Sequence, residues 1–147
     1  MQRYEESDIK LSDTFRMGEI VLIDIPNNIG HQQGGIRPAV IVSNNIGNAA
    51  SPMIKVLPIT SKRNESKQPT HVHFKAADVD GLLKDSTVEA ESTWVINKWQ
   101  VKRKLGKFTD EQLNKIAYAM VFAEPIVARA FELGIVEDLS FIKVSKT

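Results

Sequence analysis

The sequence predicts a single α+β domain built on a mostly antiparallel, strongly bent β-sheet or small barrel. Short apolar stretches separated by Gly, Pro and Asn recur through the first two thirds of the chain, and one main amphipathic helix follows them. Strands and helices do not alternate, which argues against a parallel sheet. The chain has 147 residues, 42% of them hydrophobic, and this size suits one domain with a substantial core.

Three apolar stretches predict the first strands. Gly18–Ile25 is rich in β-branched residues, and Ala39–Ser43 is almost continuously apolar. Met53–Thr60 is the third, and its internal Pro58 predicts an edge strand or a bulge because proline cannot donate to a ladder. The Asn-rich and Gly-rich stretches between these strands are expected to be loops.

Further strands and a helix are expected in the second half. Thr70–Phe74 alternates between apolar and histidine side chains, and one or two short strands are expected within 87–97. Thr109 and Gln112 match a capping box. Apolar residues then recur at helical spacing: Leu113, Ile116, Ala117, Met120 and Val121. Pro125 is expected to kink or end this helix, with a short helical resumption up to a C-cap at Gly134.

The two ends of the chain are predicted to be additions to this domain. Residues 1–17 are polar with three scattered apolar side chains, Ile9, Leu11 and Phe15, too few for a core, so we expect an N-terminal arm and a domain spanning 18–147. The tail 135–147 is expected to form a last strand or an added arm. The N-terminus lacks the apolar core of a signal peptide, and no apolar run approaches about 18 residues. We therefore expect a soluble, cytoplasmic protein without a membrane partner.

Composition and motifs exclude several kinds of chemistry. The absence of cysteine rules out disulfides, a thiolate nucleophile and Cys-based zinc sites. A net charge of +1 gives no general electrostatic argument for nucleic acid. The sequence lacks a phosphate-binding glycine loop, a nucleophile elbow and a zinc-protease motif. His71 and His73 have a spacing that could supply two metal ligands, but no third ligand stands nearby, so neither a metal nor a cofactor is predicted.

Two stretches could nevertheless contact nucleic acid. Lys98–Lys107 carries five cationic and no acidic side chains, and Trp94 and Trp99 are close to it. Positive charge follows a phosphate backbone and an indole ring stacks on unpaired bases, although a solvated basic face with tryptophans anchored in the core would look the same. Arg37, within the stretch His31–Val40, is either a phosphate clamp beside a permissive Gly-rich loop or a surface salt bridge at a strand start.

The order of the motifs resembles the MazF/PemK family of toxin endoribonucleases over residues 18–123. The matching segments are GEIVLIDI, GGIRPAVIVSNNIGN, SP, VLPITSK, PTHVHF and KDSTVEAES, followed by a terminal amphipathic helix. The resemblance implies a small SH3-like barrel, usually a homodimer, that cuts single-stranded RNA at short sequences without a metal or cofactor and is silenced by a cognate antitoxin. The C-terminal extension 124–147 lies outside it.

The resemblance also assigns roles to residues. It implies that Arg37 and Thr60 are the catalytic pair and that the neighbouring ribose 2′-hydroxyl is the nucleophile. Further RNA contacts are expected from His31, Gln32, Gln33, Ser61, Lys62, Glu91 and Ser92.

Two departures from the family pattern matter for activity. Gln32 occupies a position where many relatives carry an acidic residue. In the later strand, relatives often continue a Glu-Gln motif with an arginine, whereas this chain reads Glu91, Ser92, Thr93, Trp94. The alternative function is a non-catalytic RNA binder or a topoisomerase-poisoning toxin of related fold.

His31 offers a proton shuttle in place of the missing acid, because imidazole titrates near neutral pH. We predict that His31→Ala changes the pH dependence of the cleavage rate. An unchanged pH–rate profile would exclude the shuttle.

Overall fold

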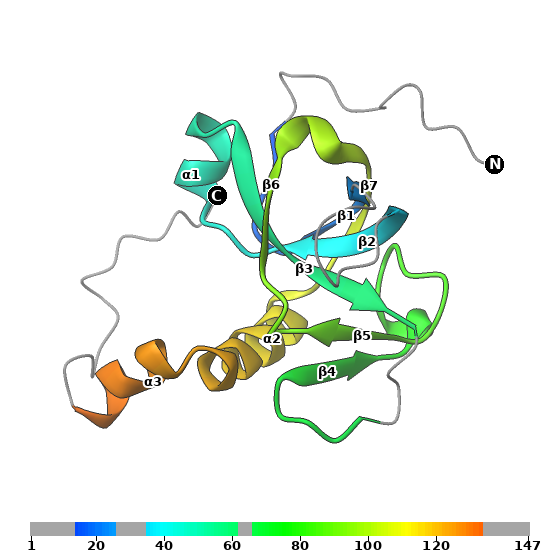
Figure 1. Ribbon diagram of the computed structural model, residues 1–147. Helices are drawn as coiled ribbons and strands as arrows, with labels where there is room; N and C mark the ends of the chain where they lie inside the picture. Colours follow the sequence, from blue (N-terminus) through cyan, green and yellow to red (C-terminus); the bar gives the residue numbers. More distant parts are fainter. Residues whose placement is uncertain (1–13, 26–34, 62–65, 134–147) are drawn as a thin grey trace.

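A computed structural model describes residues 14–25, 35–61 and 66–133, and its centre is one strongly bent antiparallel sheet of seven strands (Figure 1). The strands run in the order β4-β5-β3-β2-β1-β7, and β6 also pairs with β3. Their bounds are β1 Glu19–Ile25, β2 Gly35–Ile41, β3 Met53–Thr60, β4 His71–Phe74, β5 Ser86–Glu89, β6 Trp94–Asn97 and β7 Val101–Lys107. The helices are α1 Asn45–Ala50, α2 Asp110–Ala123 and α3 Pro125–Glu132, with short 3₁₀ turns η1 Ala76–Asp78 and η2 Lys98–Gln100. The expectation of an α+β domain with a strongly bent antiparallel sheet is confirmed, although the sheet is not closed.

The bend in the sheet arises because β3 changes its neighbour along its length. Met53 to Val56 pair with β6 on one side, whereas Ile59 and Thr60 pair with β5. Pro58 lies between these two pairings, opposite Ala39 of β2. Our expectation that Pro58 marks an edge strand or a bulge is wrong for β3 as a whole, because β3 is central and its register with β2 does not shift at Pro58. Proline is tolerated there because no strand pairs with it on one side, which is locally equivalent to an edge.

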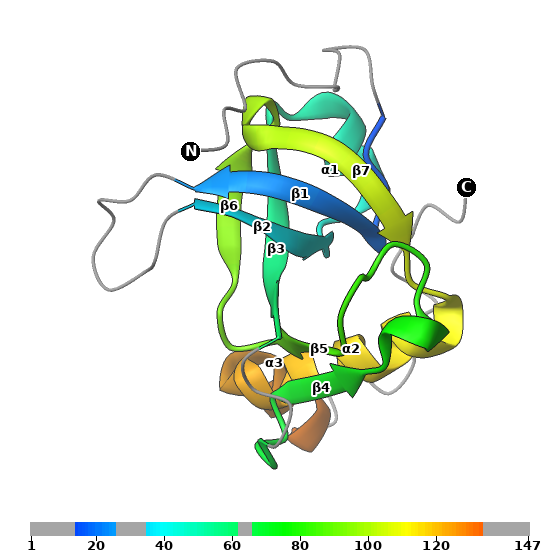
Figure 2. The same ribbon diagram turned by 90° about the vertical axis from the view of Figure 1, so that its right-hand side faces the viewer.

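Alternation along most of the strands divides the buried side chains into two cores, with register shifts where β1 pairs with β7. The barrel core lies between the curled strands of β1, β2, β3, β6 and β7 and contains Phe15, Val21, Ile23, Ile25, Ala39, Ile41, Ile54, Val56, Ile96 and Val101. The helix core lies on the other face, beneath α2, and contains Ile20, Val40, Leu57, Ile59, Phe74, Val79, Leu82, Val88, Ala90, Phe108, Ile116 and Ala119. In Figure 2, α2, α3 and β4–β5 form a layer below the upper strands. Successive residues of one strand therefore serve different cores.

Phe15 belongs to the barrel core although the sequence suggested an arm. Its side chain is 1% exposed, and the ammonium of Lys104 lies 5.5 Å from its ring centre. The backbone around it is also held, since Met17 donates to the Asn45 side chain over 2.8 Å and Lys104 donates to the Thr14 carbonyl. Excluding Phe15 from the core was wrong, because a single aromatic residue in a polar stretch carries no periodic signal.

The helical region follows the sequence closely. Thr109 caps α2, and its capping box with Gln112 is formed as predicted, with hydrogen bonds of 2.9 and 3.2 Å. α2 ends at Ala123, and Pro125 is the first residue of α3, a position where its missing N–H costs nothing. The predicted C-cap at Gly134 and the tail lie outside the described residues. No helix in the described part of the chain is both long and apolar enough to cross a membrane.

Two elements were not predicted. α1 forms in a stretch expected to be a loop, and the side chain of Asn44 caps it by accepting from the Gly47 amide. β7 forms within the basic cluster, where charged residues obscure the alternation, and it pairs with β1. The second half of that cluster is therefore part of the sheet.

We predict that Phe15→Ala lowers the free energy of unfolding by about 3–5 kcal/mol, the usual cost of deleting a buried phenyl ring. Phe122→Ala is the matched control, because Phe122 is 50% exposed on α2 and its loss should cost clearly less. Urea unfolding measures both. Equal losses would contradict the assignment of Phe15 to the barrel core.

Candidate active site

Arg37 lies in the middle of β2, on the face of the barrel core. It pairs with Ile23 of β1 and is two residues before the buried Ala39, so alternation directs its side chain to that face. Its guanidinium carbon lies 5.7 Å from the ring centre of Trp94, within the range of a cation–π interaction. Trp94 begins β6 and packs against the barrel core. An aromatic ring therefore supports the cation from one side.

Thr60 ends β3 on the same face as Arg37. Val56, Pro58 and Thr60 alternate along the strand, and Val56 belongs to the barrel core. The register of β2 and β3 runs from Ile41 opposite Val56 to Ala39 opposite Pro58. Continued by two residues, the same register would place Arg37 opposite Thr60. At this point β3 no longer pairs with β2 and instead pairs with β5. The predicted catalytic pair thus shares one face at the point where the two strands part.

Both residues belong to the lining of a cavity of about 650 Å³, although Ile36, Pro38 and Ile59 line it from the strand face opposite to the Arg37 and Thr60 side chains. It is lined by Leu22, Ile36, Arg37, Pro38, Ile59, Thr60, Ser61, Gly81, Leu82, Leu83, Lys84, Ser86, Arg103 and Leu105. The described lining carries three cations, Arg37, Lys84 and Arg103, and no carboxylate. An apolar floor with a few cationic and hydroxyl groups suits a ligand that combines flat rings with phosphates.

Glycines permit the close packing of one cavity wall. A Cβ on Gly106 of β7 would lie 2.0 Å from the Asp80 carbonyl oxygen, and one on Gly81 would lie 2.5 Å from the Leu105 carbonyl oxygen. Gly81 also has φ +99°, which disfavours any side chain there. These contacts hold the segment that carries Lys84 against β7.

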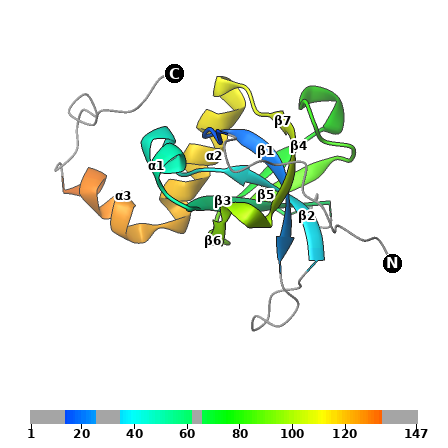
Figure 3. The ribbon, with the colours of Figure 1, turned by 90° about the horizontal axis from the view of Figure 1, so that it is seen from above.

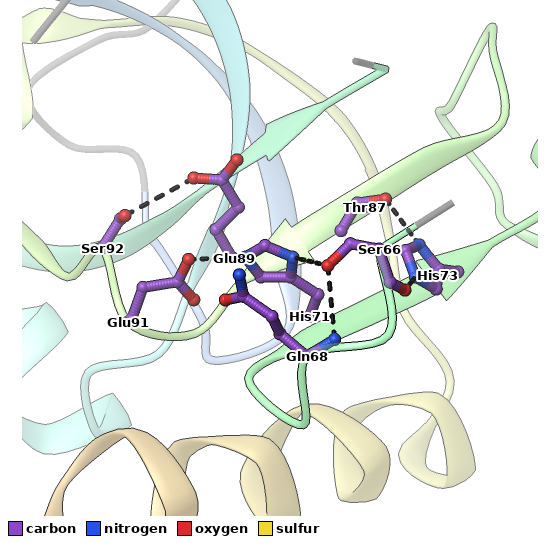
Figure 4. Close-up of polar contacts among 8 residues, drawn as sticks. All are labelled: Ser66, Gln68, His71, His73, Thr87, Glu89, Glu91 and Ser92. Carbon is purple, nitrogen blue, oxygen red and sulfur yellow. Dashed lines mark hydrogen bonds and ion pairs between the residues drawn. The ribbon is translucent and has the colours of Figure 1, made fainter. Parts of the chain in front are cut away.

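Polar side chains from β4, β5 and the segments next to them form a second cluster (Figure 4). The two ring nitrogens of His71 contact Ser66 Oγ and Glu91 Oε1, each at 2.6 Å. Partial burial acts to raise the pKa of Glu91, but hydrogen bonds from its own backbone amide, His71 and Thr70, together with the charge of His71, outweigh it and hold this pKa below its ordinary value of 4.5. Ser92 donates weakly to Glu89 over 3.4 Å.

The predicted site residues divide into three groups. Arg37, Thr60 and Ser61 meet at the cavity. Glu91 and Ser92 lie in the cluster around His71, and neither lines the cavity. Four others lie outside the described residues: His31, Gln32, Gln33 and Lys62.

Sequence reasoning missed two cationic residues of the cavity, Lys84 and Arg103. The sequence did mark Arg103 as a member of the basic cluster Lys98–Lys107. Only the pairing of β7 with β1, however, shows which cation of that cluster faces the cavity. Lys104 of the same cluster instead binds Glu19 at 3.3 Å, and Trp99 is 66% exposed. Among the described residues no three His, Asp or Glu side chains gather as metal ligands.

Sequence and fold together place this chain in a class of small toxin domains. Residues 16–121 match the model of the PemK-like, MazF-like toxins of type II toxin–antitoxin systems. The chain is 36% identical over 105 residues to the endoribonuclease MazF of Staphylococcus saprophyticus, covering 71% of this chain and 87% of that protein.

Solved structures show the same fold. A mycobacterial endoribonuclease in complex with its cognate antitoxin superposes with a TM-score of 0.61 at 27% identity, over 74% of this chain and 93% of that one. The MazE–MazF complex of Deinococcus radiodurans gives 0.60 at 19% identity, covering 75% and 95%, and so supports the fold alone. The chain belongs to the PemK/MazF toxin family, as the motif order suggested.

The lowered pKa of Glu91 predicts a pH-dependent contribution to stability. Glu91 stabilises the fold while it is ionised, so this contribution is complete above its ordinary pKa of 4.5 and is lost as the pH falls through the lower folded-state value. Glu91→Gln should therefore be less stable than the unsubstituted protein at about pH 6, and the difference should shrink at about pH 3. Urea unfolding at both pH values tests this. A difference that does not depend on pH would contradict it.

Proposed function

We propose that this chain cuts single-stranded RNA internally at short sequences, without a metal ion, and that Arg37 and Thr60 are its catalytic residues. Its membership of the family makes it an endoribonuclease toxin of the MazF type. The observation that carries the residue assignment is that the two strands place a guanidinium and a hydroxyl on one face, at the border of a cavity whose described charges are all positive.

The mechanism requires little from the protein beyond position and charge. The 2′-hydroxyl oxygen of one ribose attacks the adjacent phosphorus and loses its proton, and the bond to the 5′-oxygen of the next nucleotide breaks as that oxygen gains a proton. The products are a 2′,3′-cyclic phosphate and a 5′-hydroxyl. Because nucleophile and phosphorus belong to the same nucleotide, the attack has the advantage of proximity, and no protein nucleophile is needed.

Arg37 and Thr60 stabilise the charge that develops during attack. The phosphorane carries more negative charge than the phosphodiester, and a guanidinium offers several fixed donors to its oxygens. Trp94 restricts the guanidinium by stacking beneath it. Thr60 contributes a hydroxyl donor from the opposite strand. Arginine stays protonated at every relevant pH, which makes it a better electrostatic partner than a base.

The remaining cavity residues suit the flanking nucleotides. Lys84 and Arg103 supply positive charge for neighbouring phosphates, and the exposed Leu83 with the apolar floor supplies contact area for bases. This arrangement favours an unpaired strand, because bases within a duplex present only their edges.

The partners follow from the family. The mycobacterial neighbour was solved with its antitoxin, and we infer that a cognate antitoxin covers the RNA groove of this chain as well. We also infer a homodimer that acts in the cytoplasm, where its RNA substrates are.

We predict that the purified protein cuts a long single-stranded RNA in EDTA and that Arg37→Ala and Thr60→Ala each slow cutting by about 100-fold or more, the cost of removing one donor to a developing oxyanion. Arg129→Ala is the matched control, because Arg129 is exposed on α3, on the opposite side of the molecule from the start of β2 (Figure 3). Mapping of the product ends tests for the cyclic phosphate.

Two results would contradict the proposal. If both substitutions at the site left cutting unchanged, the catalytic assignment would be wrong. If the unsubstituted protein bound varied RNAs and cut none, the non-catalytic binder would be the better description.

A further inference from the structure

The two tryptophans near the basic cluster occupy different environments. Trp94 packs against the barrel core, whereas Trp99 is 66% exposed. The sequence left open whether such a tryptophan anchors the core or stacks on an unpaired base. Trp94 is the one that anchors the core, and Trp99 presents its indole ring to solvent.

Hydrogen bonds on both sides of Trp99 hold the turn that carries it. Trp99 is the middle residue of η2. Before it, the Lys98 amide donates to the Pro52 carbonyl oxygen over 2.9 Å. After it, the buried side chain of Gln100 donates to the Asp24 carbonyl oxygen over 3.1 Å. The turn is thereby tied to the start of β3 and to β1, so the exposed ring stands on a fixed backbone.

Cations lie on both sides of this ring in the sequence. Lys98 immediately precedes Trp99 and Lys102 follows three residues later, in a stretch of five cations without a carboxylate. A lone apolar side chain on a surface is ordinary. An indole between cations is different, because the cations attract phosphates and the ring stacks on an unpaired base of any kind. We refer to Lys98, Trp99 and Lys102 as the indole platform.

A β-bulge joins the indole platform to the cavity. Val101 and Arg103 pair with successive residues of β1 rather than with alternate ones. Lys102 is therefore the extra residue of a bulge, a feature that redirects the side chains around it. Arg103 consequently lines the cavity although Val101, two residues earlier, belongs to the barrel core. The positive surface is thus continuous along β7 from the platform to the cavity.

The distances allow one strand of RNA to reach both places. Trp99 and Arg103 are four residues apart, so their Cα atoms are at most about 14 Å apart. Val101 and Arg37 pair with Ile23 from its two sides, so their backbones are separated by two strand spacings, about 10 Å. At a rise of about 3.4 Å per nucleotide in a stacked strand, about 14 Å corresponds to about four nucleotides.

We propose that Trp99 stacks on an unpaired base of the RNA a few nucleotides away from the cleaved bond, while Lys98 and Lys102 contact the adjoining phosphates. The indole platform is then a second binding site for single-stranded nucleic acid, outside the cavity. This proposal rests on the proposed function, because it takes the strand to be held at the site of Arg37 as well. Trp99 acts on binding and not on the chemical step.

The chemistry of the platform favours nucleic acid over a protein partner. A surface tryptophan can also be the centre of a protein interface. Lysine, however, is depleted from such interfaces, and the platform has a lysine on each side of its ring. Its continuity with a cavity whose described charges are all positive points to the same strand that the cavity binds.

Single-stranded DNA is a suitable probe, because a strand without 2′-hydroxyls measures binding apart from cutting. With a mixed-sequence strand of about 16 nucleotides, we expect Trp99→Ala to raise Kd by about 5- to 100-fold, the range for loss of one base–aromatic stack. Trp99→Phe keeps an aromatic ring and should keep most of the affinity. In RNA cutting, Trp99→Ala should raise KM by about the same factor and leave kcat unchanged.

Tyr118→Ala is the matched control for these measurements. Tyr118 is 69% exposed on α2, at the opposite end of the molecule from the turn between β6 and β7 (Figures 1 and 2). Its loss should leave Kd unchanged. Tm values show that each variant is folded.

Salt dependence separates stacking from charge. Trp99→Ala should weaken binding at every salt concentration without changing the slope of log Kd against log salt, because an indole ring releases no counterion. Lys98→Ala should reduce that slope by about 0.7, the value for one phosphate contact on a single strand. Tryptophan fluorescence adds a measurement that does not need the alanine variant, since the strand should quench the unsubstituted protein more than Trp99→Phe.

Several results would overturn the indole platform. They are an equal Kd for Trp99→Ala and the unsubstituted protein, equal quenching of the unsubstituted protein and Trp99→Phe, or no binding of the strand by the unsubstituted protein. An unchanged Kd together with an altered mass of Trp99→Ala in solution would assign Trp99 to a protein interface instead. Binding through Trp99 without any cutting of RNA would contradict the proposed function and leave the platform standing.

Discussion

The change of neighbour along β3 is the constraint on which the site depends. Where β3 leaves β6 and turns to β5, it carries Thr60 away from the barrel and into register with Thr87. The same departure separates β3 from β2 and leaves Arg37 at the rim of the cavity. Pro58 stands at this junction with one side unpaired, so a residue that would weaken a regular central strand is compatible with the bend.

Periodicity predicted those elements whose pattern is not interrupted by charge. The observed bounds of β1, β3 and α2 agree with the predicted ones to within a residue or two, since each element has an unbroken apolar stripe. The cap at Thr109 was predictable because it depends only on neighbouring residues in the sequence. β7 was not predicted because four cations obscure its alternation, and Phe15 was not assigned to the core because one buried ring has no period. Both are determined by distant parts of the chain: β7 by its pairing with β1, and Phe15 by the opening that it fills in the barrel core.

Only those residues of the candidate site that belong to the family motifs could be predicted from the sequence. Arg37 and Thr60 followed from the family resemblance, and the register of β2 and β3 now gives a physical reason for pairing them. Lys84 and Arg103 did not follow, because nothing local distinguishes a cation that faces a cavity from one that faces solvent.

The all-positive described lining of the cavity bears on how RNA is distinguished from DNA. Arg37, Lys84 and Arg103 offer charge to phosphates, which are the same in both polymers, and apolar walls do not sense the sugar. In the proposed mechanism, only the attack itself needs the 2′-hydroxyl. Single-stranded DNA would on this basis occupy the groove and remain uncut, so discrimination would lie in the chemical step rather than in binding, and cellular single strands of either kind would compete for the toxin.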